Sequence, residues 1–189
     1  MRRHIFWVLT AAILALACHV AYLLFVPSRS FSLAIDRALG EDHRNRFVLL
    51  DTAAQLRLVP SASSEHVVGI CKFNVSEGPV RVTAKLPDGF WSFAVYTIRG
   101  RQVYAINDTQ ADTDTFSVEL SQDKGLLSQI LGAGEDTNDV IGDNIGWRIA
   151  ITETQGLAVL WLAVADPLLR KEAEDVVKQS RCVRLDGAT

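Results

Sequence analysis

The chain has 189 residues, of which 49% are hydrophobic, 22% charged and 8% aromatic, with a formal net charge of −3. Its mean hydropathy is +0.16. This composition excludes a disordered chain, which would have too few apolar residues, and three cysteines are too few for a disulfide-dense scaffold. The length allows one domain of about 150 residues beside a short segment, and excludes two large domains.

The apolar excess is concentrated between Ile5 and Val26, a stretch that contains no charged residue. As a helix it would extend about 33 Å, which is enough for a hydrocarbon core of about 30 Å. Trp7 and Tyr22 lie near its two ends, where aromatic rings favour the lipid headgroups. Pro27 is expected to end the helix. The sequence therefore predicts one transmembrane helix, a signal anchor, over residues 5–26.

Arg2 and Arg3 precede this span together with the α-amino group, whereas Arg29 and Arg37 follow it. Positive charges that flank the first helix usually stay in the cytoplasm. We therefore expect residues 1–4 in the cytoplasm and the remainder outside the bacterial inner membrane, in the periplasm, with the lipid bilayer as a partner of the chain.

Two alternatives remain open for the first segment. Ala15-Leu16-Ala17 has the small-x-small form of a signal-peptide cleavage site, although cleavage would leave the apolar stretch from His19 as the new N-terminus. The residues up to Cys18 loosely resemble a lipobox, and lipidation would replace spanning by anchoring. His19 itself is either a functional proton or metal site or a neutral, locally hydrogen-bonded side chain.

Beyond the span, residues 27–46 are predicted to form a juxtamembrane helix and linker, with the helix ending before Gly40. Residues 47–182 are predicted to form a β domain. Its strand-length runs, bounded by turn residues, are 66–75, 80–86, 91–99, 102–107, 115–120, 147–152 and 157–164. The first four predict an antiparallel meander, and the last two predict a strand pair whose second strand is central.

Asp166 and Pro167 predict a final helix over residues 166–180, followed by a flexible tail over residues 183–189. Leu168, Leu169, Ala173, Val176 and Val177 would give that helix a buried stripe. Regular hairpin spacing without βαβ alternation favours a sandwich. The predicted fold is thus mainly β, an antiparallel β-sandwich with peripheral helices, preceded by the transmembrane helix.

The two cysteines of the predicted domain are Cys71 and Cys182. In an oxidising compartment they could form a disulfide that closes a loop of about 110 residues, worth about 4–5 kcal/mol in the chain-entropy model. The alternative is two separate free thiols, because spacing alone does not establish geometry. From Ile35 onward the chain holds 16 basic and 22 acidic residues, a net charge of −6, which argues against nucleic acid as a partner.

Motifs for catalysis are missing from the sequence: it contains no G-x-S-x-G, H-E-x-x-H, C-x-x-C or P-loop pattern. His66 and Cys71 would point to opposite faces of one strand, which argues against a nucleophile and base pair. Between Asp108 and Asp143 there are nine acidic residues, which could hold calcium or could be a solvated loop that protects sheet edges. We assign no catalytic residue, metal or cofactor.

Aromatic residues are the best candidates for a binding surface. Alternation along residues 90–96 places Trp91 on one face of a strand and Phe90 and Tyr96 on the other. One face should be core and the other could contact a small ligand or another envelope protein, although core packing alone would explain most of the pattern. The candidate surface comprises Phe90, Trp91, Tyr96, Tyr104 and Trp161.

The run from Asp88 to Tyr96 has a G-F-W-S-x-x-x-Y pattern, and a second block runs from Gly156 to Pro167. With Val68-Gly69-Ile70-Cys71 and the N-terminal helix, these residues resemble a domain-of-unknown-function family of small single-span inner-membrane proteins of rhizobia-like bacteria. The resemblance implies a periplasmic β domain and no established activity. We expect a non-enzymatic protein that binds an envelope protein or a small ligand; the alternative is an envelope hydrolase that uses carboxylates such as Asp108 and Asp112.

Overall fold

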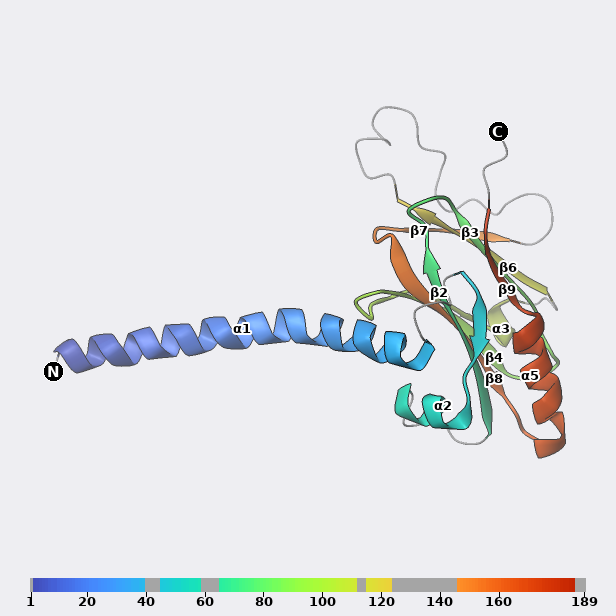
Figure 1. Ribbon diagram of the computed structural model, residues 1–189, viewed down its shortest axis with the longest axis horizontal. Helices are drawn as coiled ribbons and strands as arrows, with labels where there is room; N and C mark the ends of the chain where they lie inside the picture. Colours follow the sequence, from blue (N-terminus) through green and yellow to red (C-terminus); the bar gives the residue numbers. More distant parts are fainter. Residues whose placement is uncertain (1, 40–44, 59–64, 112–114, 124–145, 186–189) are drawn as a thin grey trace, which may run out of the picture.

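The computed structural model describes residues 2–39, 45–58, 65–111, 115–123 and 146–185 (Figure 1). Most of the acidic segment between Asp108 and Asp143, and most of the predicted C-terminal tail, lie outside these ranges. One long helix projects from a β-rich body, with the N-terminus at its far end.

The projecting helix, α1, extends from Arg2 to Leu39 and is long and apolar enough to cross a membrane. The prediction that Pro27 ends the helix is wrong, because α1 continues through this position. Proline removes one backbone hydrogen bond from a helix, but the residues beyond it gain burial: Ile35 and Leu39 are 3% and 4% exposed against the body. The predicted juxtamembrane helix is thus the last part of α1, which is described as far as Leu39.

The described residues contain nine strands in two sheets. The first sheet is antiparallel, with the order β1 (Phe47–Leu49), β2 (His66–Asn74), β8 (Gln155–Ala163), β4 (Trp91–Thr97) and β5 (Gln102–Asn107). The second has the order β7 (Trp147–Ile151), β6 (Thr115–Gln122), β3 (Val80–Lys85) and β9 (Arg181–Arg184). It is mixed, because β6 and β7 pair in parallel. The β-rich, two-sheet class is therefore confirmed, whereas the expectation of purely antiparallel pairing is wrong.

The connections differ from the predicted meander. Of the four described strands predicted as a meander, only β4 and β5 form a hairpin, because the chain crosses to the second sheet at β3 between β2 and β4. The predicted pairing of β7 with β8 is also wrong, since these two strands belong to different sheets. The central position predicted for β8 is confirmed: it pairs with β2 on one side and β4 on the other.

The remaining helices are short: α2 (Thr52–Leu58), α3 (Asp108–Ala111), the 3₁₀ turn η1 (Pro167–Leu169) and α5 (Arg170–Gln179). Asp166 caps η1 as predicted, because its carboxylate accepts a hydrogen bond from the Leu168 N–H at 2.9 Å. The buried stripe is only partly right, since Ala173 and Val177 are buried but Leu168 and Leu169 are exposed. The predicted tail begins too early, because β9 occupies residues 181–184 and pairs with β3.

Between the sheets lies one apolar cluster to which both contribute. Phe73 and Phe93 of the first sheet and Phe116 of the second are each 1% exposed or less, and the rings of Phe93 and Phe116 lie 4.5 Å apart. In β4 every second residue is buried, which is the pattern of a strand that turns one face to the core.

A second apolar cluster covers the outer face of the first sheet. Val68 and Ile70 of β2 and Leu157 of β8 pack there with Ile35 and Leu39 of α1. Ala54 and Leu58 of α2 are partly buried against this cluster. Because β2 has core on both faces, its residues 67–71 are buried without a break. This outer cluster fixes the end of α1 on the sheet.

Candidate functional site

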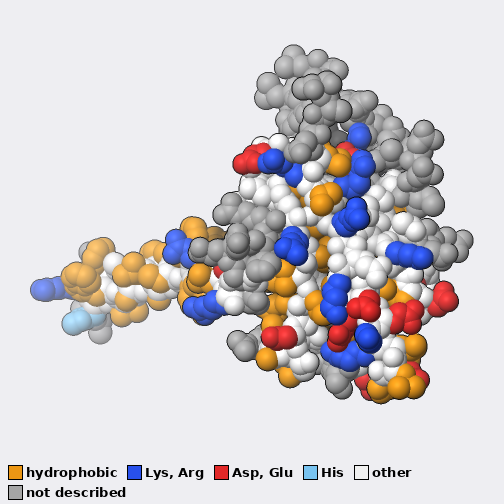
Figure 2. Space-filling model, turned by 45° about the vertical axis from the view of Figure 1, so that its right-hand side comes forward, with side chains coloured by type: hydrophobic (Ala, Val, Ile, Leu, Met, Phe, Trp, Pro, Cys, Tyr) orange, Lys and Arg blue, Asp and Glu red, His pale blue; other side chains and the backbone are white. Residues whose placement is uncertain are grey.

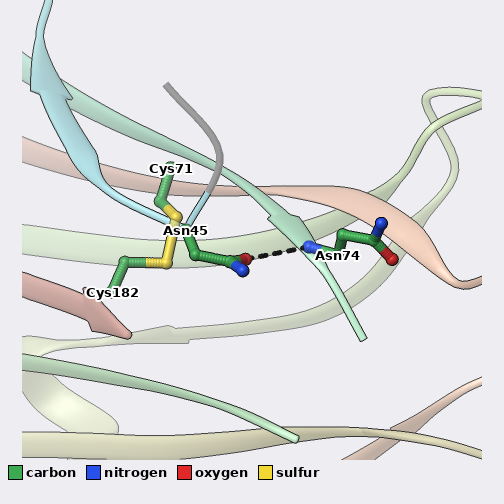
Figure 3. The surroundings of a disulfide bond; sticks show 4 residues. All are labelled: Asn45, Cys71, Asn74 and Cys182. Atoms are coloured by element: carbon green, nitrogen blue, oxygen red, sulfur yellow. Dashed lines mark hydrogen bonds between the residues drawn. A yellow bond between two sulfur atoms is a disulfide. The ribbon is translucent and has the colours of Figure 1, made fainter. Parts of the chain in front are cut away.

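The Cys71–Cys182 disulfide joins β2 of the first sheet to β9 of the second, at a Cα–Cα distance of 6.5 Å (Figure 3). Its neighbour Asn45, two residues before the start of β1, has a φ of 53° and is hydrogen-bonded to β2. The Asn45 N–H donates to the Lys72 carbonyl at 2.8 Å, and its Oδ1 accepts from the Asn74 N–H at 3.0 Å. The predicted disulfide is confirmed, and it ties the two sheets together.

The structure separates the five aromatic residues predicted to form a binding surface. Trp91 is 3% exposed and packs in the core between the sheets, so it is not available at a surface. Tyr96 and Trp161 lie on the opposite face, against the outer cluster. Phe90 is 53% exposed at the start of β4, and Tyr104 packs at the margin of the core.

Two of these aromatic residues have further features. The ring of Trp161 meets that of His66 edge to face at 4.9 Å, which places His66 on the outer face and away from Cys71. Burial raises the pKa of Tyr104 above its ordinary value of 10.0, because the phenolate form is poorly solvated at the core margin.

Of the two carboxylates considered for a hydrolase, the described residues include Asp108 but not Asp112. Asp108 opens α3, and its Oδ1 is buried without a hydrogen-bond partner within the described part of the chain. Among the described residues, no group of three or more His, Cys, Asp or Glu side chains could hold a metal ion.

A hollow of about 440 Å³ lies where α1 meets the turn between β4 and β5. Its lining residues are Arg29, Ser32 and Leu33 of α1 with Ile98 and Arg99 of the turn; we call it the helix–hairpin hollow. Figure 2 shows that hydrophobic side chains cover most of α1, and that Lys and Arg side chains lie where the helix meets the β body. Sequence reasoning missed this site, although Arg29 and the turn Arg99-Gly100-Arg101 carried the signal.

Glycine makes the close approach of the hairpin possible. Gly100 has a φ of +80°, and a Cβ at this position would lie 3.3 Å from the ring of Phe31. The turn therefore rests directly on the aromatic side chain of α1. This contact brings Ile98 and Arg99 beside the helix.

The charge in the hollow is partly balanced from one side. The Arg99 Nε lies 3.7 Å from Oε1 of Glu153, while the Arg99 side chain remains 74% exposed. Arg101, two residues along, donates from Nη2 to the Thr152 hydroxyl at 3.4 Å. A guanidinium has five N–H donors, so one long ion pair leaves Arg99 able to bind a further anion.

No family model and no curated protein matches the chain. Its fold is similar to that of the VPA0106 protein from Vibrio parahaemolyticus, with a TM-score of 0.59 and 12% identity over 84% of this chain and 35% of that one. An uncharacterised protein from Burkholderia cenocepacia is also similar, with a TM-score of 0.52 and 14% identity over 82% and 38% of the two chains. This chain thus spans less than two fifths of either protein, and the likeness shows the fold alone.

Proposed function

We propose that the chain is a single-span protein of the bacterial inner membrane whose β-sandwich domain lies in the periplasm and binds an envelope protein or a small ligand. The observation that carries this proposal is the continuity of α1. The helix passes from its apolar stretch into the body, where Ile35 and Leu39 dock on the sheet. A domain held in this way stays within reach of the membrane surface.

Two further observations support the proposal. The Cys71–Cys182 bond fits an oxidising compartment such as the periplasm. The helix–hairpin hollow offers a cationic and apolar surface at the membrane end of the domain. Membership of the small single-span family that the sequence resembles belongs to the same proposal.

Photo-crosslinking in native membranes tests this function. A photoreactive amino acid replaces Ile98, which lines the hollow, and as the matched control it replaces Glu172 on α5. We expect a reproducible adduct with an envelope protein or a smaller membrane molecule from position 98 and not from position 172, identified by mass spectrometry. Equal background labelling from both positions would contradict a binding role for this end of the domain.

A further inference from the structure

We propose that the helix–hairpin hollow binds the phosphate of a membrane phospholipid headgroup. The inference rests on the proposed function, because it requires α1 to span the bilayer. It names the class of ligand that the proposed binding domain takes at this end.

The Arg29 end of the hollow matches the headgroup layer. Arg29 follows the last residue of the uncharged stretch, Val26, by three residues, which is about 4.5 Å along a helix. The headgroup region is about 5–7 Å thick on each side of the hydrocarbon core. Arg29 therefore lies at the level of the lipid phosphates when residues 5–26 fill the core.

The second arginine comes from a distant part of the chain. Arg99 belongs to the β4–β5 turn, which rests on Phe31 through Gly100 and so shares the hollow with Arg29. Two arginines that line one hollow from different elements suit a phosphate, because each guanidinium can donate paired N–H bonds to its oxygens. The folded domain thus adds a charge that the helix alone lacks.

The apolar part of the lining favours a lipid over a free phosphate ion. Leu33 is 53% exposed on α1, and Ile98 faces the same hollow from the turn. The headgroup alcohol of a phospholipid carries carbon on the water side of its phosphate, where Leu33 lies, and would cover these side chains, whereas inorganic phosphate would leave them in water. Glu153 holds one side of Arg99, so we expect a site for a single phosphate and not a broad polyanion surface.

Native mass spectrometry of the full chain in detergent, with lipid added, tests the site. The probes are phosphatidylglycerol and, separately, inorganic phosphate. We expect retained phosphatidylglycerol, with about a fivefold loss of apparent affinity for Arg29→Gln and again for Arg99→Gln. Arg181→Gln, which removes an exposed arginine from β9 of the second sheet, is the matched control and should retain lipid like the parent.

Each of the other outcomes overturns the lipid site. Retention by both hollow variants equal to that of Arg181→Gln would show that the arginines do not hold the lipid. Displacement of the lipid by millimolar inorganic phosphate would assign the site to a free anion. Formation of the Cys71–Cys182 bond in each variant shows that it is folded.

A topology assay separates this failure from that of the proposed function. Labelling of domain residues from outside intact inner membranes reports whether α1 spans. If the domain is labelled from outside but the hollow variants retain lipid as well as Arg181→Gln does, only the lipid site is rejected. A domain inaccessible from outside rejects the proposed function, and the lipid site with it, because Arg29 would no longer lie at the headgroup level of the outer surface.

Discussion

At the residue scale, two glycines in neighbouring central strands allow close packing for different reasons. A Cβ at Gly156 of β8 would lie 2.4 Å from both the ring of Phe73 and the backbone oxygen of Tyr96. At Gly69 of β2 the nearest atom is a methyl group of Val177 at 2.5 Å. A backbone oxygen in a paired strand cannot move without breaking the sheet, whereas a side chain on a helix can give way.

We therefore expect Gly156→Ala to lower the free energy of unfolding by about 3 kcal/mol or more, and Gly69→Ala by about 1–2 kcal/mol. The measurement is urea unfolding followed by tryptophan fluorescence. In the background Val177→Ala, which removes the opposing methyl groups, Gly69→Ala should cost less than in the parent. An equal cost in both backgrounds would contradict this account of the contact.

Alternation in the sequence correctly predicted the two faces of β4, since Trp91 and Phe93 are in the core and Tyr96 is not. It could not predict that the other face would also be covered. That cover comes from Ile35 and Leu39, more than fifty residues earlier in the chain. Alternation identifies residues on one face of a strand, but which distant element packs on that face depends on tertiary structure.

At the scale of elements, the docking of α1 on the first sheet depends on buried side chains and on one ion pair. Ile35 is 3% exposed, and the next residue, Asp36, pairs with Lys72 of β2. The ion pair is partly exposed and contributes little compared with the apolar contact.

Ile35→Ala should lower the free energy of unfolding by about 2–4 kcal/mol, because it leaves a cavity in the outer cluster. The matched control is Leu33→Ala on the same helix, where the side chain is 53% exposed and a change within about 0.5 kcal/mol is expected. Both are measured by urea unfolding of the full chain in detergent. If the two variants lost equal stability, α1 would not be docked by burial of Ile35.

The disulfide is the second link between elements. It joins residues 111 positions apart, and cross-linking so long a loop reduces the entropy of the unfolded chain. The double substitution Cys71→Ser with Cys182→Ser should therefore cost about 4–5 kcal/mol. Cys18→Ser removes the free cysteine of α1 and should leave stability unchanged.

Reduction of the disulfide in the parent should lower the free energy of unfolding by as much as the double substitution does. The same reductant should not change the free energy of unfolding of the double variant. A parent whose unfolding midpoint does not respond to a reductant would contradict the stabilising role of the bond.

The sequence predicted most strand positions but not their partners. Turn residues mark where β2, β3 and β4 begin and end, yet Glu77-Gly78-Pro79 leads into the opposite sheet and not into a hairpin. Short β9 was missed because four residues carry too little pattern; in the structure it pairs with β3, and its Cys182 is bonded to Cys71 of β2 in the other sheet. The helix–hairpin hollow was missed because Arg29 and Arg99 are far apart in the sequence and line one hollow only in the folded chain.

At the scale of the whole molecule, the proposed function makes the charges around α1 and the disulfide depend on the same property, the side of the membrane on which the domain would lie. Arg2 and Arg3 precede the apolar stretch, and Arg29 and Arg37 follow it, so the balance between the two ends is close. Removing charge at one end should therefore shift the proposed orientation in a direction that the positive-inside rule fixes.

Arg2→Gln with Arg3→Gln should increase the share of molecules whose domain stays in the cytoplasm, whereas Arg29→Gln with Arg37→Gln should reduce it. Molecules with a cytoplasmic domain would keep Cys71 and Cys182 reduced, because that compartment maintains thiols. Alkylation before and after reduction then counts the two orientations in one sample. Full disulfide formation in both pairs of variants would mean that these arginines do not set the orientation, and the topology would have to be decided by the folded domain or the apolar stretch itself.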